Sequence, residues 1–140
     1  MTINIQQLLH GTVAEVFDGE SVKWRELACD SHVHGLLLSA EEGVDARIRR
    51  AELRASHDWF DARILDLDVG VTLFAYGDSE VEKAIEIREL AHLILACFRG
   101  EGQITYRPNL IRRRSVPTLT VETEGRRWSL RRSTCTYTGL

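Results

Sequence analysis

Cysteine is scarce in this chain, and its cysteines are too few to build a covalent framework. Cys29, Cys97 and Cys135 lie far apart in a sequence of 140 residues, and an odd number leaves at least one thiol unpaired. Small secreted domains that lack a large core depend on several closely spaced disulfides. The sequence therefore excludes a disulfide scaffold, and we expect reduced thiols.

Long apolar runs are also missing. No run approaches the roughly 18 to 20 residues that cross a bilayer, and no basic stretch followed by an apolar core opens the sequence. We therefore expect a cytoplasmic protein with no membrane partner. The absence of any low-complexity stretch argues against a disordered chain.

The chain does have enough apolar material for one core. Of its 140 residues, 44% are apolar and 28% are charged. A chain of this length buries roughly two-thirds of the surface that its unfolded form exposes. We therefore expect residues 1–140 to form a single globular domain.

The middle of the chain carries the clearest patterns. Residues 62–74 alternate between apolar and polar side chains and predict one strand, with Asp66 and Asp68 on its solvent face. Ser79, with Glu82 three residues later, forms a capping box ahead of an amphipathic stripe, which predicts a helix over 79–98. Gly100 stands where the C-terminal cap of this helix is expected.

The flanking segments also predict strands. Residues 33–39 form a short apolar run, Pro108-Asn109 predicts a turn, and residues 118–132 alternate around Glu124-Gly125 as in a hairpin. Together these elements predict an α+β fold, with a mainly antiparallel sheet and one long helix, about 79–98, packed on one face.

Two segments are ambiguous. Gly11 interrupts a helical stripe near the N-terminus, so we favour a helix over 3–10, then a strand over 12–17 and a hairpin-type turn at Asp18-Gly19. Between residues 47 and 60, helical and alternating patterns overlap, and both a helix and a strand remain open.

Nucleophilic catalysis finds no support in the sequence. No serine lies in a Gly-x-Ser-x-Gly turn, and none of the three cysteines has neighbours that would lower its pKa. We therefore expect no cofactor, and a noncatalytic role is favoured over an enzymatic one.

One alternative is a metal-dependent enzyme that uses Asp66 and Asp68. The segment Asp66-Leu67-Asp68 resembles the paired-aspartate element of minimal nucleotidyltransferases, and Ser56 lies upstream where that family has a Gly-Ser pair. The resemblance implies that the two carboxylates hold Mg²⁺ against nucleotide phosphates. The glycine of the pair is replaced by Ala55, and no downstream carboxylate clearly matches the third one of that family.

A second metal hypothesis joins Cys29, His32 and His34, with His57 or Asp58 as a fourth ligand. Zinc accepts thiolate and imidazole ligands together. Strand alternation places Cys29 and His32 on opposite faces, so we favour surface histidines and no metal.

The charges are divided unevenly along the chain. Residues 1–100 have 10 Lys or Arg against 18 Asp or Glu, whereas residues 101–140 have 8 Arg against 3 Glu. Arginines with aromatic residues among them can bind nucleic acid, but a chain with a net charge of −3 is less basic than most nucleic-acid binders. Nucleic-acid binding through this C-terminal cluster is the second alternative.

Separate acidic and basic patches on one small domain favour docking to a protein. We therefore expect a noncatalytic protein-binding module, such as an adaptor, inhibitor or neutralising partner. The residues that we expect to bind the partner are charged or aromatic: Arg107, Arg112, Arg113, Arg114, Arg126, Arg127, Trp128, Asp66 and Asp68.

Overall fold

The computed structural model describes residues 3–41, 47–109, 114–123 and 125–132. Two helices and eight strands are found in these ranges. In chain order they are α1 (Ile5–Val16), β1 (Val22–Leu27), β2 (His34–Ala40), β3 (Arg50–Ala55), β4 (Trp59–Ile64), β5 (Val69–Phe74), α2 (Glu80–Phe98), β6 (Gln103–Asn109), β7 (Arg114–Thr123) and β8 (Arg126–Arg131).

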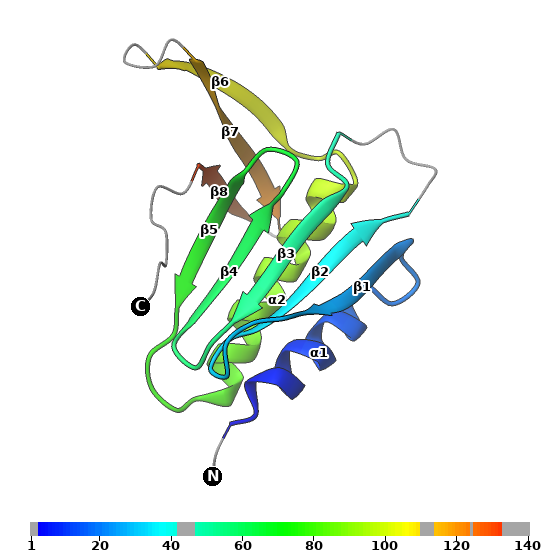
Figure 1. The fold of residues 1–140 in the computed structure, drawn as a ribbon, viewed down its shortest axis with the longest axis vertical. Coiled ribbons are helices and arrows are strands. Elements are labelled where there is room, and N and C mark those ends of the chain that lie inside the picture. Colours follow the sequence, from blue (N-terminus) through cyan, green and yellow to red (C-terminus); the bar gives the residue numbers. More distant parts are fainter. Residues whose placement is uncertain (1–2, 42–46, 110–113, 124, 133–140) are drawn as a thin grey trace.

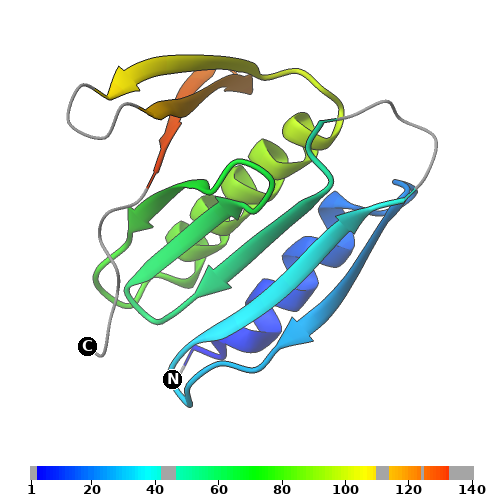
Figure 2. The same ribbon diagram turned by 45° about the horizontal axis from the view of Figure 1, so that its top comes forward.

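All strand pairs are antiparallel, in the order β1-β2-β3-β4-β5-β8-β7-β6. Strands β1 to β5 form one meander and β6 to β8 another, and among the described residues one pair, Gly70 with Arg131, joins them. Figure 1 shows both helices behind the first meander, and Figure 2 shows the same layering from another angle. The predicted α+β fold, with a long helix on one face of an antiparallel sheet, is confirmed.

Helix α2 forms where the capping box predicts it. The Ser79 side chain accepts a hydrogen bond from the backbone N–H of Glu82, and Gly100 has a positive φ of 75° past the C-terminal end. The C-terminal half of α2 is buried on nearly every side because it packs between α1, the strands β3 and β4, and β7.

The prediction for the N-terminus is right about a helix at 3–10 and wrong about the strand over 12–17 and the hairpin at Asp18-Gly19. One helix runs from Ile5 to Val16, through Gly11, and Gly19 lies in the turn to β1 rather than in a hairpin. A glycine inside a helix costs about 1 kcal/mol, which the burial of Leu9 and Val13 offsets.

The prediction of one strand over 62–74 is also wrong. The chain turns at residues 65–68, so β4 ends at Ile64 and β5 begins at Val69, with these two residues paired. Apolar residues alternate straight through the turn, and periodicity therefore could not reveal it. Asp68 takes the left-handed conformation (φ 54°), which aspartate tolerates better than most residues.

The predictions for the other segments are confirmed in part. The expected strand at 33–39 corresponds to β2, and the open segment 47–60 is extended, since it contains β3 and the start of β4. The expected hairpin over 118–132 is present, with Thr123 paired to Arg126. Pro108-Asn109 is not a turn, because both residues lie within β6 and pair with β7.

The core lies between the helices and one face of the sheet. Alternate residues of β2, β3 and β4 point to the helices and are fully buried, among them Leu36, Leu53 and Phe60. Core residues of β7 and β8 belong to the same cluster. None of the helices in the described ranges is long and apolar enough to cross a membrane.

Gly70 on β5 tests the close approach of β5 to β4. A Cβ at this position would lie 2.8 Å from the carbonyl oxygen of Ala62. We expect Gly70→Ala to lower the free energy of unfolding by roughly 1 to 2 kcal/mol, because the neighbouring backbone must shift. Chemical denaturation with a constant m-value checks this change.

Gly11→Ala is the matched control for this glycine. An added Cβ there meets nothing within 4 Å, and the position is exposed in the middle of α1. We expect a gain of about 0.5 to 1 kcal/mol from the higher helix propensity of alanine. Equal effects of the two substitutions would contradict the close approach at Gly70.

Candidate functional site

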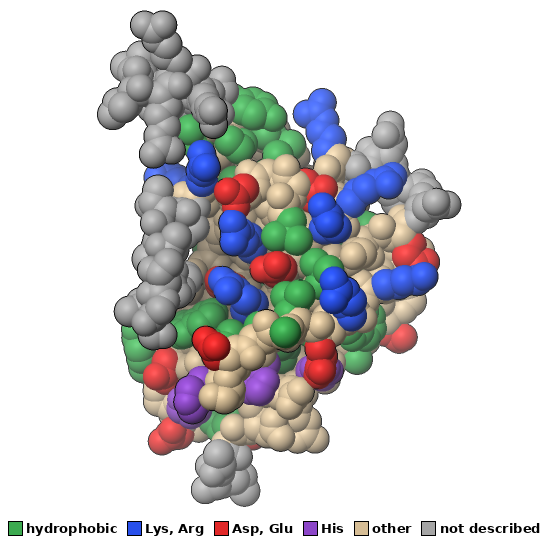
Figure 3. All heavy atoms as spheres, in the orientation of Figure 1, with side chains coloured by type: hydrophobic (Ala, Val, Ile, Leu, Met, Phe, Trp, Pro, Cys, Tyr) green, Lys and Arg blue, Asp and Glu red, His purple; other side chains and the backbone are tan. Residues whose placement is uncertain are grey.

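The sheet face opposite α1 and α2 is covered by neither helix, and it carries an excess of cations. On β1 to β5 its charged side chains are five cations and two carboxylates, as the pairing registers place them. We call the five cations the basic face: Lys23, Arg25, Arg50, Arg54 and Arg63. Figure 3 shows Lys and Arg side chains gathered over the middle of this side of the molecule, with few carboxylates between them.

Cross-strand pairing arranges part of the basic face in a row. Arg25 pairs with Leu37, Leu37 with Glu52, and Glu52 with Arg63. Paired residues of antiparallel strands have side chains on the same face. The row then continues through Gly70 to Arg131 on β8, so arginines from three strands stand along one line.

Two of these cations, Arg25 and Arg50, are exposed and form no ion pair with the described residues. Within the parts of the chain that the structure describes, no ion pair joins the side chain of Arg25 or Arg50 to a carboxylate. Lys23 lies 3.9 Å from Glu41, a distance at the limit of an ion pair. This part of the basic face is therefore free to pair with an external carboxylate.

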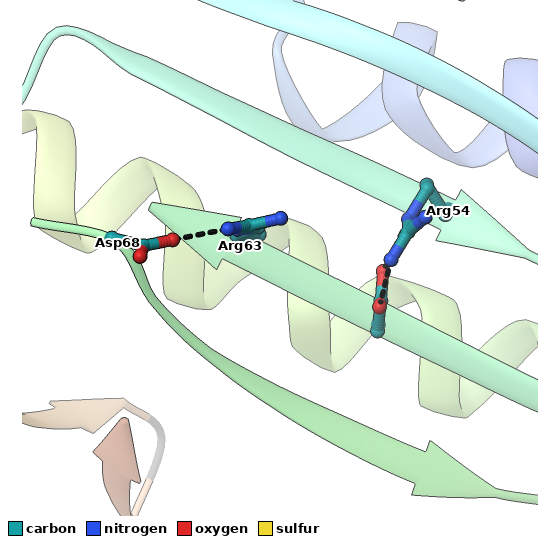
Figure 4. Close-up of polar contacts among 4 residues, drawn as sticks. Arg54, Arg63 and Asp68 are labelled. Atoms are coloured by element: carbon teal, nitrogen blue, oxygen red, sulfur yellow. Dashed lines mark hydrogen bonds and ion pairs between the residues drawn. The ribbon is translucent and has the colours of Figure 1, made fainter. Parts of the chain in front are cut away.

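Two arginines of the basic face are held by aspartates (Figure 4). Arg54 reaches from β3 to Asp61 on β4, donating from Nε (3.1 Å) and Nη2 (2.8 Å), and the Asp61 side chain is only 8% exposed. The hydrogen bond to Asp61 raises the pKa of Arg54. Arg63 pairs with Asp68 in the turn that follows β4.

Aromatic side chains gather at one end of the same face. Trp59 pairs with Phe74 across β4 and β5, and the Arg54 guanidinium lies 5.9 Å from the centre of the Trp59 ring. The rings of Phe74 and Tyr76 stack with centres 5.9 Å apart, and these two residues are 54% and 71% exposed. We call Arg54, Trp59, Phe74 and Tyr76 the aromatic corner.

The structure places Asp66 and Asp68 in structural roles. Asp66 accepts hydrogen bonds from the backbone N–H groups of Arg49 and Arg50, at 3.0 and 2.9 Å. Asp68 pairs with Arg63 and lies 3.7 Å from Arg132. The premise that both aspartates stand on one face of a strand is wrong, because they lie in the turn between β4 and β5.

The C-terminal cluster is only partly visible. Arg112 and Arg113 lie outside the described residues, and for Arg107 and Arg114 only the strand backbone is described. Arg127 is exposed on β8.

Trp128 and Arg126 are occupied within the protein. Trp128 is 3% exposed, and its Nε1 donates to Thr123 at 2.8 Å. Its ring is therefore part of the core, which corrects the expectation that it lies on an open binding surface. Arg126 stacks 4.0 Å from the centre of this ring and pairs with Glu89 of α2.

The proposed metal ligands do not converge. Cys29 and His32 lie in the loop between β1 and β2, rather than on opposite faces of a strand, and His57 binds Asp58 (Nδ1 to Oδ1, 3.0 Å). No three His, Cys, Asp or Glu side chains of the described ranges are placed to hold a metal ion. Burial raises the pKa of the Cys29 thiol, which opposes a thiolate ligand.

The side away from the basic face is acidic. Helix α2 carries Glu80, Glu82, Glu86 and Glu89 on its surface against one exposed cation, Arg88, whereas Lys83 is buried. Burial and the neighbouring Glu89 raise the pKa of Glu86. The molecule is therefore polarised, with cations on the open sheet face and carboxylates on the helical side.

Comparison with protein-family models, curated proteins and solved structures finds no match to this chain. The geometry of the two faces is thus the basis for assigning a function.

Proposed function

We propose that this chain is a noncatalytic protein-binding module whose basic face binds an acidic surface of a partner protein. The single observation that supports it is the excess of cations on the face of the β1–β5 meander that neither α1 nor α2 covers. One of the two carboxylates on this face, Asp61, is buried under Arg54 and exposes almost no charge.

The charge pattern favours a protein over a nucleic acid. A duplex or single strand presents a continuous line of phosphates, which suits an uninterrupted basic track. On this face, Glu52 stands between Arg25 and Arg63 within the row, and Asp68 neutralises Arg63. The acidic surface of α2 also opposes a wrapped polyanion, whereas it would orient an incoming acidic protein toward the sheet.

The paired variant Arg25→Gln/Arg50→Gln tests this proposal. We expect it to weaken binding of the partner by tenfold or more, because two unpaired cations that face the partner carboxylates are lost. The partner is a protein recovered in stoichiometric amount from a lysate of the source organism and identified by mass spectrometry. Its affinity is then measured by calorimetry at two salt concentrations, and binding should weaken as salt rises.

The matched control is Arg88→Gln/Arg99→Gln, which changes the net charge equally. These arginines pair with Glu15 and Glu20 away from the basic face, so we expect affinity within about twofold of the unaltered protein. Equal losses in both variants would overturn the assignment to this face.

Two further measurements separate the alternatives. Loss of binding only in Arg112→Gln/Arg113→Gln would move the site to the C-terminal cluster. Tight, salt-sensitive binding of a fluorescent 20-nucleotide strand, with no protein captured, would replace the proposal by nucleic-acid binding. A protein that captures no acidic partner would contradict the proposal outright.

A further inference from the structure

Arg54 differs from the other cations of the basic face because two hydrogen bonds to a buried carboxylate fix its guanidinium, whereas the partner of Arg63, Asp68, is half-exposed. Two bonds to Asp61 and the nearby Trp59 ring define its orientation. Gly35 on the neighbouring strand leaves room for its stem, since a Cβ there would lie 3.2 Å from Cγ of Arg54. An arginine held in this way loses little conformational entropy when it binds a second group.

The fixed guanidinium still has hydrogen-bond donors to offer. An arginine side chain has five N–H donors, and Asp61 takes one from Nε and one from Nη2. The Arg54 side chain is 27% exposed, so solvent reaches it although its partner is buried. A carboxylate from another molecule can therefore bind the remaining donors while the bond to Asp61 stays intact.

The neighbouring rings supply an apolar contact surface. Phe74 and Tyr76 have large exposed fractions and stack nearly parallel, with an angle of 12° between the planes. Arginine, tyrosine and tryptophan are the residues most enriched where interfaces concentrate their binding energy. The aromatic corner combines these residue types on one end of an otherwise charged face.

We infer that the aromatic corner is the anchor of the interface, and that it binds an acidic and apolar segment of the partner. A partner carboxylate binds Arg54, and an apolar side chain of the same segment packs on Phe74 and Tyr76. This inference rests on the proposed function and deepens it. Asp58 and Asp78 lie beside the corner, where they favour a segment with one carboxylate over a strand of phosphates.

A random dodecamer library displayed on phage tests the inference with the full chain as bait. We expect enriched peptides to share an Asp or Glu next to an apolar residue or two positions from it, since alternate residues of an extended segment lie on the same side. Synthetic versions of these peptides then give affinities by fluorescence anisotropy. Enrichment of basic peptides, or of none, would overturn the inference.

Arg54→Lys is the sharpest variant, because it keeps the charge and removes the bidentate geometry. We expect affinity for the selected peptides to fall by five- to tenfold, and Phe74→Ser to reduce it similarly. The control is Arg88→Lys on α2, which should leave affinity within about twofold. Circular dichroism melting confirms that each variant is folded.

The outcomes distinguish the two proposals. If Arg25→Gln/Arg50→Gln abolishes partner binding but Arg54→Lys and Phe74→Ser do not, the basic face is supported as the docking surface. The inference that the aromatic corner is the anchor is then contradicted. If Arg54→Lys and Phe74→Ser no longer bind the peptide but Arg25→Gln/Arg50→Gln still binds the partner, the aromatic corner is supported as a peptide site. The basic face is then not the docking surface. Competition of the peptide by a 20-nucleotide strand at equal affinity would overturn the choice of an acidic peptide.

Discussion

Replacing Lys83 by methionine is expected to lower the free energy of unfolding by roughly 2 to 5 kcal/mol. Lys83 lies in the first turn of α2 and is only 1% exposed. Its Nζ donates to the backbone carbonyls of His57 and Ala75. Methionine fills the same space without donors, so the buried carbonyl of Ala75 and the part-buried carbonyl of His57 lose this donor at about 1 to 3 kcal/mol each, with the larger cost at Ala75.

The position of these carbonyls explains why the loss should be large. His57 lies in the turn between β3 and β4, and Ala75 follows β5 directly. Ala75 also donates to the carbonyl of Asp58, so one ammonium group holds two chain segments and the start of the long helix together. The same segments carry Trp59, Phe74 and Tyr76, so Lys83 also supports the aromatic corner.

Arg88→Met is the control for this experiment, since it removes a cation from the same helix. Arg88 is exposed and pairs with Glu15, and we expect a change below about 1 kcal/mol. Urea denaturation of both variants gives the comparison. A loss of less than 1 kcal/mol in Lys83→Met would show that water satisfies the two carbonyls instead.

Local signals in the sequence predict the elements that they specify directly. The capping box at Ser79 and the stripe behind it define α2, because both are contained within one element. The turn at residues 65–68 was not predicted, because the leucines at positions 65 and 67 continue the alternating pattern of a strand through it. The predicted end of the helix before Gly11 was wrong for a related reason, because tertiary packing offsets the low helix propensity of this glycine.

The candidate site depends on contacts that the sequence order hides. Counting charges along the chain predicts a basic site at the arginines after residue 101, whereas the cations of the basic face come from β1, β3 and β4. Each of these strands contributes one to two cations among acidic neighbours, so no local excess is visible. Alternating cations at positions 23 and 25 and at 50 and 54 were the available signal. The pairing of the strands is what turns them into one surface.

The polarity of the molecule bears on how a partner approaches. Cations on the open sheet face and carboxylates on α2 produce a dipole across the layers. Such a field increases the association rate for an acidic partner, and salt within the physiological range screens much of it. The short-range contacts at the aromatic corner are less sensitive to salt. In the proposed interface, we therefore expect substitutions on the basic face to change the association rate and substitutions at the aromatic corner to change the dissociation rate.

Cys97 should make the protein less stable as pH rises above 9. This thiol is 1% exposed in α2, and burial, with a smaller effect of Glu101, raises its pKa from 9.0 to about 12. Because the folded pKa lies above the unfolded one, the unfolded state releases its proton first as pH increases. Stability that is fully present below pH 9 is then lost between pH 9 and 12.

The expected loss from this thiol is roughly 2.5 kcal/mol between pH 8 and pH 11, at about 1.4 kcal/mol for each pKa unit. Tyrosines and lysines also titrate in this range, so the measurement is the difference in slope between the unaltered protein and Cys97→Ala. We expect the variant to start lower at pH 8, because it leaves a small cavity, and to lose less stability on the way to pH 11. Parallel slopes would show that the Cys97 thiolate reaches solvent in the folded protein.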